Sequence, residues 1–374
     1  MQGNIVYISP LQADSMLNQA NLFKRLLEEC GYEAIYKSTI SVEDLNRDDV
    51  AGAIWFQLAT INFIGDAIVP YILGKKPKVL YVTIEGVPTK GNVAHSNMRR
   101  CEFVAVSNFV KECLQSVGLR VRKVVHHAID WKLCGEIHKR NLLQKRQTEQ
   151  LAKDRVKFIV VARDDPRKNL KGLADAMRIL NQKGYEKDYV VFLITDESAR
   201  EKFQGINNAV FLKGFGGSPH EMVLGYMACC DYLIHPAYSE GFGLPVLEAG
   251  AVGIPALHAD YAPLNEFSSP DFNFLFSYID KQPVKANQYQ YWIFHVFTPD
   301  MLAEIMDYAI DVFKNHRDEY EEYCTKAREW TRKWDYHVKY VELMKELKLP
   351  IPQWLVEQSK IEDYEIVELS DGRS

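Results

Sequence analysis

Short apolar runs alternate with helical patterns along the first third of the chain. The runs that predict buried strands lie at residues 5–9, 31–38, 51–57, 78–86, 103–107 and 122–130. Between them, apolar residues recur at helical spacing, as in the stretch from Leu17 to Leu27. Strands that alternate with helices favour parallel pairing through crossover connections. We therefore expect a doubly wound parallel α/β sheet in this part of the chain.

A second alternating set of strand and helix patterns begins at residue 156. Its predicted strands lie at 156–162, 189–195, 209–214 and 229–234, with helices over 168–183 and 219–229. The polar, basic stretch 132–153 between the two sets is typical of a linker. We predict two Rossmann-like domains, 1–145 and 150–335, that face a central cleft, with ligand bound at the carboxyl ends of the second domain's strands.

The last third of the chain has a less regular pattern. An aromatic stretch at 268–298 favours a strand pair or hairpin of unassigned role, and helices are predicted over 299–314 and 318–347. We expect a C-terminal helix over about 335–360 to pack back on the first domain.

The length of the chain agrees with two domains, because 374 residues exceed what one hydrophobic core usually supports. No apolar run approaches the length needed to span a bilayer, and the N-terminus lacks the pattern of a signal peptide. Seven scattered cysteines show no disulfide or metal-ligand spacing. We expect a cytoplasmic protein with reduced thiols and no bound metal.

Positive charge is concentrated in the first domain. From Lys75 to Arg146 the sequence has 15 basic against 5 acidic residues, although the whole chain carries a net charge of −5. Such an excess is typical either of a solvated face or of a surface that attracts anionic substrates or an anionic membrane. Peripheral membrane contact is therefore one prediction, and nothing in the pattern indicates a nucleic-acid partner.

The stretch from His235 to Pro255 has the pattern of a strand end, a glycine loop and a helix. Gly241 and Gly243 interrupt the chain, and Pro245 stands where a first helical residue tolerates proline. We expect a helix that begins near Leu244. Its free N–H groups and dipole would form an anion site to which the glycines allow close approach.

Two carboxylates belong to this segment. Glu240 lies in the predicted loop and Glu248 about one turn into the helix, eight positions on. Both side chains can face the space in front of the helix end. An acidic residue in a first helical turn is also ordinary dipole stabilisation, so the spacing alone leaves both interpretations open.

The string EGFGLPVLEAGAVGIP, Glu240 to Pro255, resembles the signature of the family-4 retaining glycosyltransferases. The resemblance implies a GT-B fold and transfer of a hexose, with retention of its anomeric configuration, from a UDP- or GDP-sugar to a sugar, lipid-linked or protein acceptor. It also implies that the second domain binds the donor, that the first domain contacts the acceptor, and that no cofactor is required.

The resemblance assigns roles to individual residues. Glu248 is expected to bind the ribose hydroxyls and Glu240 to orient the transferred sugar. Arg163 and Lys168 match a basic pair, five positions apart, that stabilises the leaving diphosphate. The remaining expected donor-site residues are Gly241, Phe242, Gly243, Leu244 and Phe215.

The first domain departs from the family pattern. The loop after its first strand lacks the usual glycine pair, Glu85 stands where a histidine is common, and His126 and His127 lie in place of another family string. Two alternatives therefore stay open: a nucleotide-sugar-binding subunit without turnover, and a nucleotide-sugar epimerase of GT-B architecture.

Overall fold

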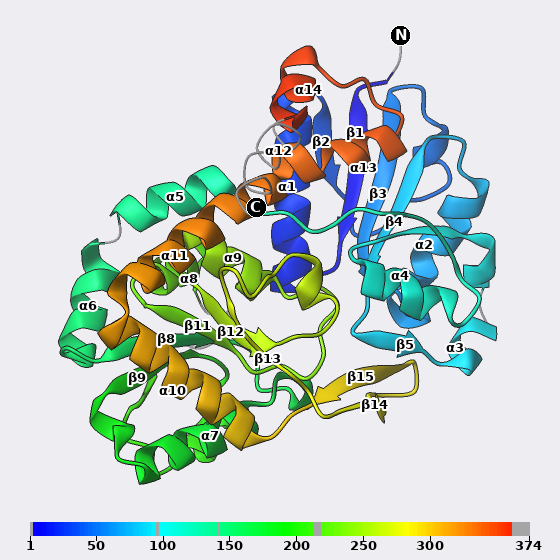
Figure 1. Ribbon diagram of the computed structural model, residues 1–374. Coiled ribbons are helices and arrows are strands. Elements are labelled where there is room, and N and C mark those ends of the chain that lie inside the picture. Colours follow the sequence, from blue (N-terminus) through cyan, green and yellow to red (C-terminus); the bar gives the residue numbers. More distant parts are fainter. Residues whose placement is uncertain (1–2, 95–96, 141, 213–217, 361–374) are drawn as a thin grey trace, which may run out of the picture. The chain divides into compact units, whose positions relative to one another are not determined.

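The computed structural model describes residues 3–94, 97–140, 142–212 and 218–360. The chain divides into two compact units (Figure 1). Unit 1 comprises Met1–Asp130, Lys285–Tyr291 and Lys333–Ser374, and unit 2 comprises Trp131–Val284 and Trp292–Arg332. Each unit is therefore assembled from separate parts of the sequence.

Unit 1 is built on a six-stranded parallel sheet of order β2-β1-β3-β4-β6-β7. Its strands are β1 (Ile5–Pro10), β2 (Glu33–Tyr36), β3 (Val50–Leu58), β4 (Lys78–Thr83), β6 (Glu102–Ala105) and β7 (Arg120–Val124). The connecting helices are α1 (Asp14–Glu29), α2 (Ile61–Leu73), α3 (Lys90–Ala94) and α4 (Asn108–Gln115). Every residue of β1 is buried, as a central strand covered on both faces requires.

The C-terminal segment completes the core of unit 1. It forms three short helices, α12 (Tyr336–Lys339), α13 (Val341–Glu346) and α14 (Gln353–Ser359), in place of the single helix predicted over 335–360. Pro350 and Pro352 interrupt the helical pattern, because proline has no backbone N–H group to donate a helical hydrogen bond. Tyr340 is fully buried, with its ring 5.8 Å from that of Phe23 and 6.3 Å from that of Tyr81.

Unit 2 has a second six-stranded parallel sheet, of order β10-β9-β8-β11-β12-β13. Its strands are β8 (Val156–Val161), β9 (Tyr189–Ile194), β10 (Ala209–Phe211), β11 (Tyr232–His235), β12 (Ala256–Ala259) and β13 (Phe274–Phe276). Its helices include α7 (Leu170–Gln182), α8 (His220–Met227), α9 (Leu244–Val252), α10 (Pro299–Asn315) and α11 (Arg317–Thr331). The strand order reverses between β8 and β11, which is where open α/β sheets bind ligands.

The predicted linker is part of unit 2. Residues 132–140 lie in α5 (Trp131–Arg140) and residues 142–152 in α6 (Leu142–Ala152), and α5 packs against α8 and α9. Trp131 anchors the segment, since its indole donates to the Arg328 carbonyl at 3.0 Å and its ring lies 3.8 Å beneath the Arg328 guanidinium. Unit 2 therefore begins nearer residue 131 than the predicted residue 150.

The aromatic stretch at 268–298 contains a strand pair, as predicted. Its strands are β14 (Asp280–Lys285) and β15 (Gln290–Val296). The turn between them, within Lys285–Tyr291, belongs to unit 1. There the Thr89 N–H, which follows β5 (Gly86–Pro88), donates to the Tyr289 carbonyl at 2.8 Å. Among the residues that the structure describes, no helix is long and apolar enough to cross a membrane.

Candidate active site

Two loops meet at the carboxyl edge of the unit 2 sheet, one after β8 and one after β11. In the first, the Asp165 side chain accepts from the Arg167 N–H at 3.0 Å, and Asn169, with φ of 51°, caps α7 by accepting from Gly172 N–H at 3.1 Å. The second loop is tied to the first because the Tyr238 N–H donates to the Arg167 carbonyl at 2.7 Å. These caps hold Arg167 and Lys168 beside the β8–β11 switch point.

Glu240 is the buried carboxylate between these loops, only 6% exposed. Arg167 Nη1 lies 3.1 Å from its Oε2, the Lys168 amine contacts its Oε1, and His235 Nε2 lies 3.0 Å from Oε1. Burial alone would raise the pKa of Glu240, but the charges of Lys168 and Arg167 outweigh burial and hold that pKa well below its usual range. Glu240 is therefore ionised.

Two fixed cations, Arg167 and Lys168, lie beside Glu240. Burial lowers the pKa of His235, so its imidazole is neutral near pH 7. Arg167 also lies near a second carboxylate, with its Nε 3.9 Å from Asp165 Oδ1, so the two cations face two carboxylates. The guanidinium and ammonium groups still offer fixed positive potential to an anionic ligand.

The N-terminus of α9 adds to this positive potential. Gly243, with φ of 101°, is its N-cap, Pro245 occupies the first turn, and no described side chain caps the helix. A Cβ atom at Gly243 would clash with Leu264 Cδ2, so only glycine fits. Phe242 stacks on Phe267 with ring centroids 4.7 Å apart, which fixes the loop in front of the helix.

Glu248 lies in the second turn of α9 and is 8% exposed. His220, the first residue of α8, places Nε2 2.7 Å from Glu248 Oε1. Burial would lower the pKa of His220, but the charge of Glu248 and its hydrogen bond raise it. Glu248 thus has one oxygen engaged by an imidazole.

The structure groups the predicted residues differently from the sequence pattern. Lys168 contacts Glu240, whereas Arg163 is exposed at the end of β8 and Arg167 occupies the second cationic position. The prediction did not include Arg167, His235 or His220. Phe215 lies outside the described residues, so its predicted place in the donor pocket stays a prediction.

Leu244 and the loop glycines lie where the pattern predicts, at the start of α9. Groups of three or more histidine, cysteine or acidic side chains that could hold a metal ion are absent from the described part of the chain. Arg167, Lys168 and the helix end supply positive charge here for an anionic ligand.

Residues 143–278 match the family model described as glycosyl transferases group 1. This region of the chain is similar to that family. The matched region spans the β8 and β11 loops and includes Glu240 and Glu248.

Sequence relatives of the chain carry the same kind of name. It is 28% identical over 267 residues to uncharacterized glycosyltransferase 335 of Sulfolobus islandicus rod-shaped virus 1, covering 69% of this chain and 76% of the relative. It is also 28% identical over 115 residues to the O-antigen chain mannosyltransferase B of Escherichia coli, but this covers only 27% of this chain and 28% of that protein.

Solved structures resemble the chain over both units. A glycosyltransferase from Rickettsia africae superposes with a TM-score of 0.71 at 12% identity, covering 93% of this chain and 98% of that one. The Anabaena protein HepE, in complex with UDP and glucose, superposes with a TM-score of 0.68 at 14% identity, covering 93% and 100%. The predicted GT-B fold, with two Rossmann-like domains, is thereby confirmed.

Proposed function

We propose that this protein is a retaining hexosyltransferase that moves a sugar from a UDP- or GDP-sugar to a sugar, lipid-linked or protein acceptor. The observation that carries the proposal is the buried Glu240 held by two cations, Arg167 and Lys168, at the switch point of the region similar to group 1 glycosyl transferases. This combination supplies positive charge where a diphosphate would leave.

Sugar transfer from a nucleotide donor places negative charge on the departing diphosphate. Cations fixed before the reaction stabilise that charge more in the transition state than in the ground state. Arg167 and Lys168 are fixed in this way because Glu240 holds both. Glu240 then has two roles in the proposal: it positions the cations, and it orients the transferred sugar as the family resemblance implies.

Glu248 is proposed to bind the ribose of the donor. Its two carboxylate oxygens suit a vicinal diol, and the neighbouring end of α9 suits the adjoining phosphate. His220 occupies Oε1 in this structure, so the ribose would use Oε2 or displace the imidazole. The complexes of HepE with UDP and with UDP-glucose favour a uridine donor for this chain.

The charges of Arg167 and Lys168, together with the α9 terminus, lead us to propose transfer without a metal or other cofactor. The anomeric configuration of the product, read by NMR spectroscopy, tests the retaining course. Activity that survives excess EDTA would support the metal-free proposal.

A matched pair of lysine substitutions tests the whole proposal. Lys168→Gln should lower kcat/KM for donor turnover by on the order of 10²-fold, because one preorganised charge is lost. Lys171→Gln, in the first turn of α7, where the side chain is 77% exposed, should leave it unchanged. Release of nucleoside diphosphate from a panel of UDP- and GDP-sugars gives both rates.

The outcomes separate the proposed transferase from its alternatives. Equal activity in both lysine variants would contradict the role of Lys168. Donor binding by folded protein without release of sugar or nucleoside diphosphate would indicate a binding subunit, and a donor converted into its epimer would indicate an epimerase.

A further inference from the structure

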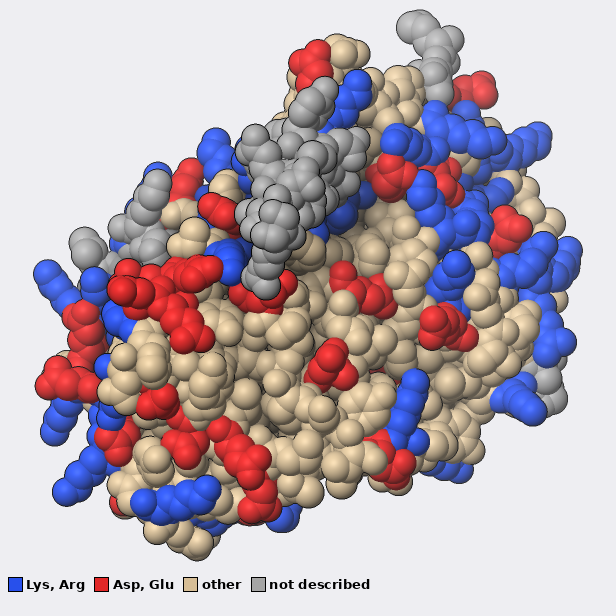
Figure 2. Space-filling model, viewed as in Figure 1, with Lys and Arg blue, Asp and Glu red and all other residues tan. Residues whose placement is uncertain are grey.

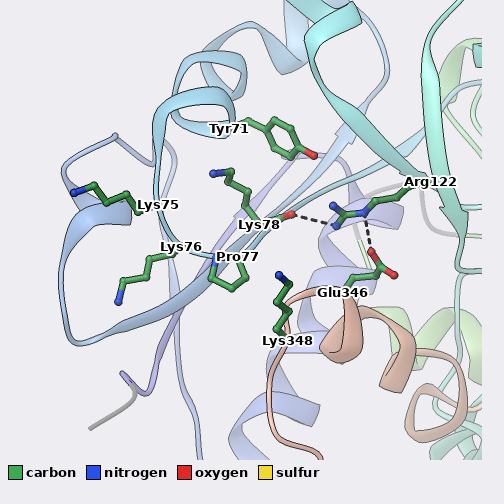
Figure 3. Close-up of a pocket in the computed structure, with 8 residues that line it drawn as sticks. All are labelled: Tyr71, Lys75, Lys76, Pro77, Lys78, Arg122, Glu346 and Lys348. Carbon is green, nitrogen blue, oxygen red and sulfur yellow. Dashed lines mark hydrogen bonds and ion pairs between the residues drawn. The ribbon is translucent and has the colours of Figure 1, made fainter.

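A cavity of about 280 Å³ lies in unit 1, at the amino-terminal edge of its sheet. Figure 3 shows the side chains around it. Lys75 and Lys76 come from the segment before β4, Lys78 begins β4, and Arg122 lies on β7. Open α/β sheets bind their usual ligands at the opposite, carboxyl edge, so this cavity is separate from such a site within unit 1.

The wall of the cavity is strongly basic. Four lysines and Arg122 line it, and the fourth lysine is Lys348, just beyond the end of α13. The single lining carboxylate, Glu346, is already engaged, with its Oε2 2.7 Å from Arg122 Nε. Five cations against one paired carboxylate leave an excess of positive charge.

Three of these lysines form no close ion pair with any carboxylate that the structure describes: Lys75, Lys76 and Lys348 have none within 4 Å. The charge of Lys76 helps to lower the pKa of Asp49, but the direct partner of Asp49 is Arg47, at 2.6 Å. Like charges gathered without partners repel one another, and a bound anion would relieve that repulsion.

Arg122 gives the cavity a fixed donor. Its guanidinium donates to the Lys78 carbonyl at 3.2 Å and pairs with Glu346, as the dashed lines in Figure 3 show. A guanidinium has five N–H donors, and these contacts use two of them. The others remain for a ligand with several acceptor oxygens, which is the geometry that phosphate offers.

The surroundings of the cavity carry the same sign. From Lys75 to Asp130, where the basic stretch belongs to unit 1, the sequence has 10 basic against 4 acidic residues. Figure 2 shows lysine and arginine side chains gathered over unit 1 around β4 and α2, whereas acidic side chains gather along α10 and α11 of unit 2. An anion that approaches this part of unit 1 is therefore attracted before it reaches the cavity.

The size of the cavity is sufficient for a phosphate group. A water molecule takes up about 30 Å³ of liquid, so about 280 Å³ accommodates one phosphate group with part of what it is attached to. We propose that this cavity binds a phosphate group, either as a free phosphate or as the headgroup of an anionic lipid. Both sources offer the same oxygens to Arg122 and the lysines.

The test compares two double substitutions of equal charge in the full-length chain. Lys76→Gln with Lys348→Gln removes two charges from the cavity. Lys90→Gln with Lys111→Gln removes two from the same basic stretch but outside the cavity. Every protein also carries Lys168→Gln, which weakens the proposed donor site, so that binding there is not mistaken for binding in the cavity.

Titration calorimetry with inorganic phosphate and pyrophosphate tests whether the cavity binds free phosphate. Co-sedimentation with phosphatidylglycerol vesicles, compared with phosphatidylcholine vesicles, tests whether it binds the headgroup of an anionic lipid. We expect saturable binding of at least one probe, reduced tenfold or more by the cavity substitutions and less than twofold by the control pair. Equal losses in both variants, or no binding of either probe, would overturn the proposal.

Discussion

At the scale of single residues, the arrangement around Glu240 links stability to function. A buried carboxylate that holds two cations is costly to disrupt, because removal of one partner of a buried ion pair typically costs about 3–5 kcal/mol. The same contacts hold Arg167 and Lys168 ready for an anionic ligand. Substitution of Glu240 frees both cations and is therefore expected to affect both properties at once, whereas substitution of Lys168 leaves Arg167 to pair with Glu240.

The contact between His220 and Glu248 predicts a pH-dependent stability. The folded protein raises the pKa of His220 above its ordinary 6.5, so folding favours the protonated form. This stabilisation is complete below the unfolded pKa and is lost as pH rises through the folded one. The melting temperature of the wild type should exceed that of His220→Gln most near pH 6, with the difference shrinking toward pH 9.

Glu248→Gln provides the control for this prediction. Without the carboxylate charge, burial lowers the pKa of His220 and only the weaker effect of Glu221 opposes it, so the melting-temperature difference caused by substituting His220 should no longer be largest near pH 6. If the melting temperatures of the wild type and His220→Gln differed by the same amount at every pH, His220 and Glu248 would not share a proton-linked interaction.

At the scale of elements, the start of α9 depends on one glycine. Gly243→Ala should destabilise the fold by about 1–3 kcal/mol for the left-handed backbone and by about 1–3 kcal/mol more for the clash with buried Leu264. Gly184 has nearly the same φ, 98° against 101°, and a Cβ atom there would have no neighbour within 4 Å. Gly184→Ala should therefore show the backbone cost alone.

Urea denaturation of the two alanine variants gives the steric cost as the difference between their unfolding free energies. Calorimetry with UDP should show weaker binding only for Gly243→Ala, because only that change disturbs the helix end. Similar stabilities for the two variants would mean that Leu264 moves aside at little cost.

The sequence predicted this element well because its signals are local. Pro245 and the glycines fix where α9 begins, and the alternating pattern fixes the parallel sheets. The neighbours of Glu240 and Glu248 are not local: Arg167 is 73 positions from Glu240, and His220 is 28 positions from Glu248. Only the strand order brings them together, and no spacing rule in a single sequence contains that information.

The beginning of unit 2 was harder to predict for a similar reason. Residues 132–153 are polar on average, which is typical of a linker, yet the contact of Trp131 with Arg328 joins positions 197 apart. The contact of Trp131 with Arg328 thus helps to hold this polar stretch in unit 2.

At the scale of the whole molecule, the dependence of unit 1 on its last helices can be measured. Truncation after Arg332 removes Tyr340 and Leu343, both fully buried, and the Trp334 and Tyr336 backbone bonds to Ile129. Amide hydrogen exchange should show β1, β3 and β4 losing protection, while β8, β9 and β11 of unit 2 keep theirs.

Truncation after Lys360 is the control, because it keeps α12, α13 and α14, which supply the buried Tyr340, Leu343 and Leu355. Protection of β1, β3 and β4 should then persist. Loss of protection in unit 2 upon truncation after Arg332, to the same extent as in unit 1, would contradict the assignment of residues 333–360 to unit 1 alone.

The split course of unit 1 also has a consequence for synthesis on the ribosome. The Tyr340 hydroxyl donates to the Gln19 side chain across 321 positions. The helix α1, which is synthesised first, therefore cannot form this contact until Tyr340 has been synthesised. At 5–20 residues per second, the roughly 200 residues between Asp130 and Lys333 take about 10–40 s to translate. During that time the nascent chain exposes the apolar surface that α12 and α13 later cover, and the second unit to emerge is the first that can finish folding.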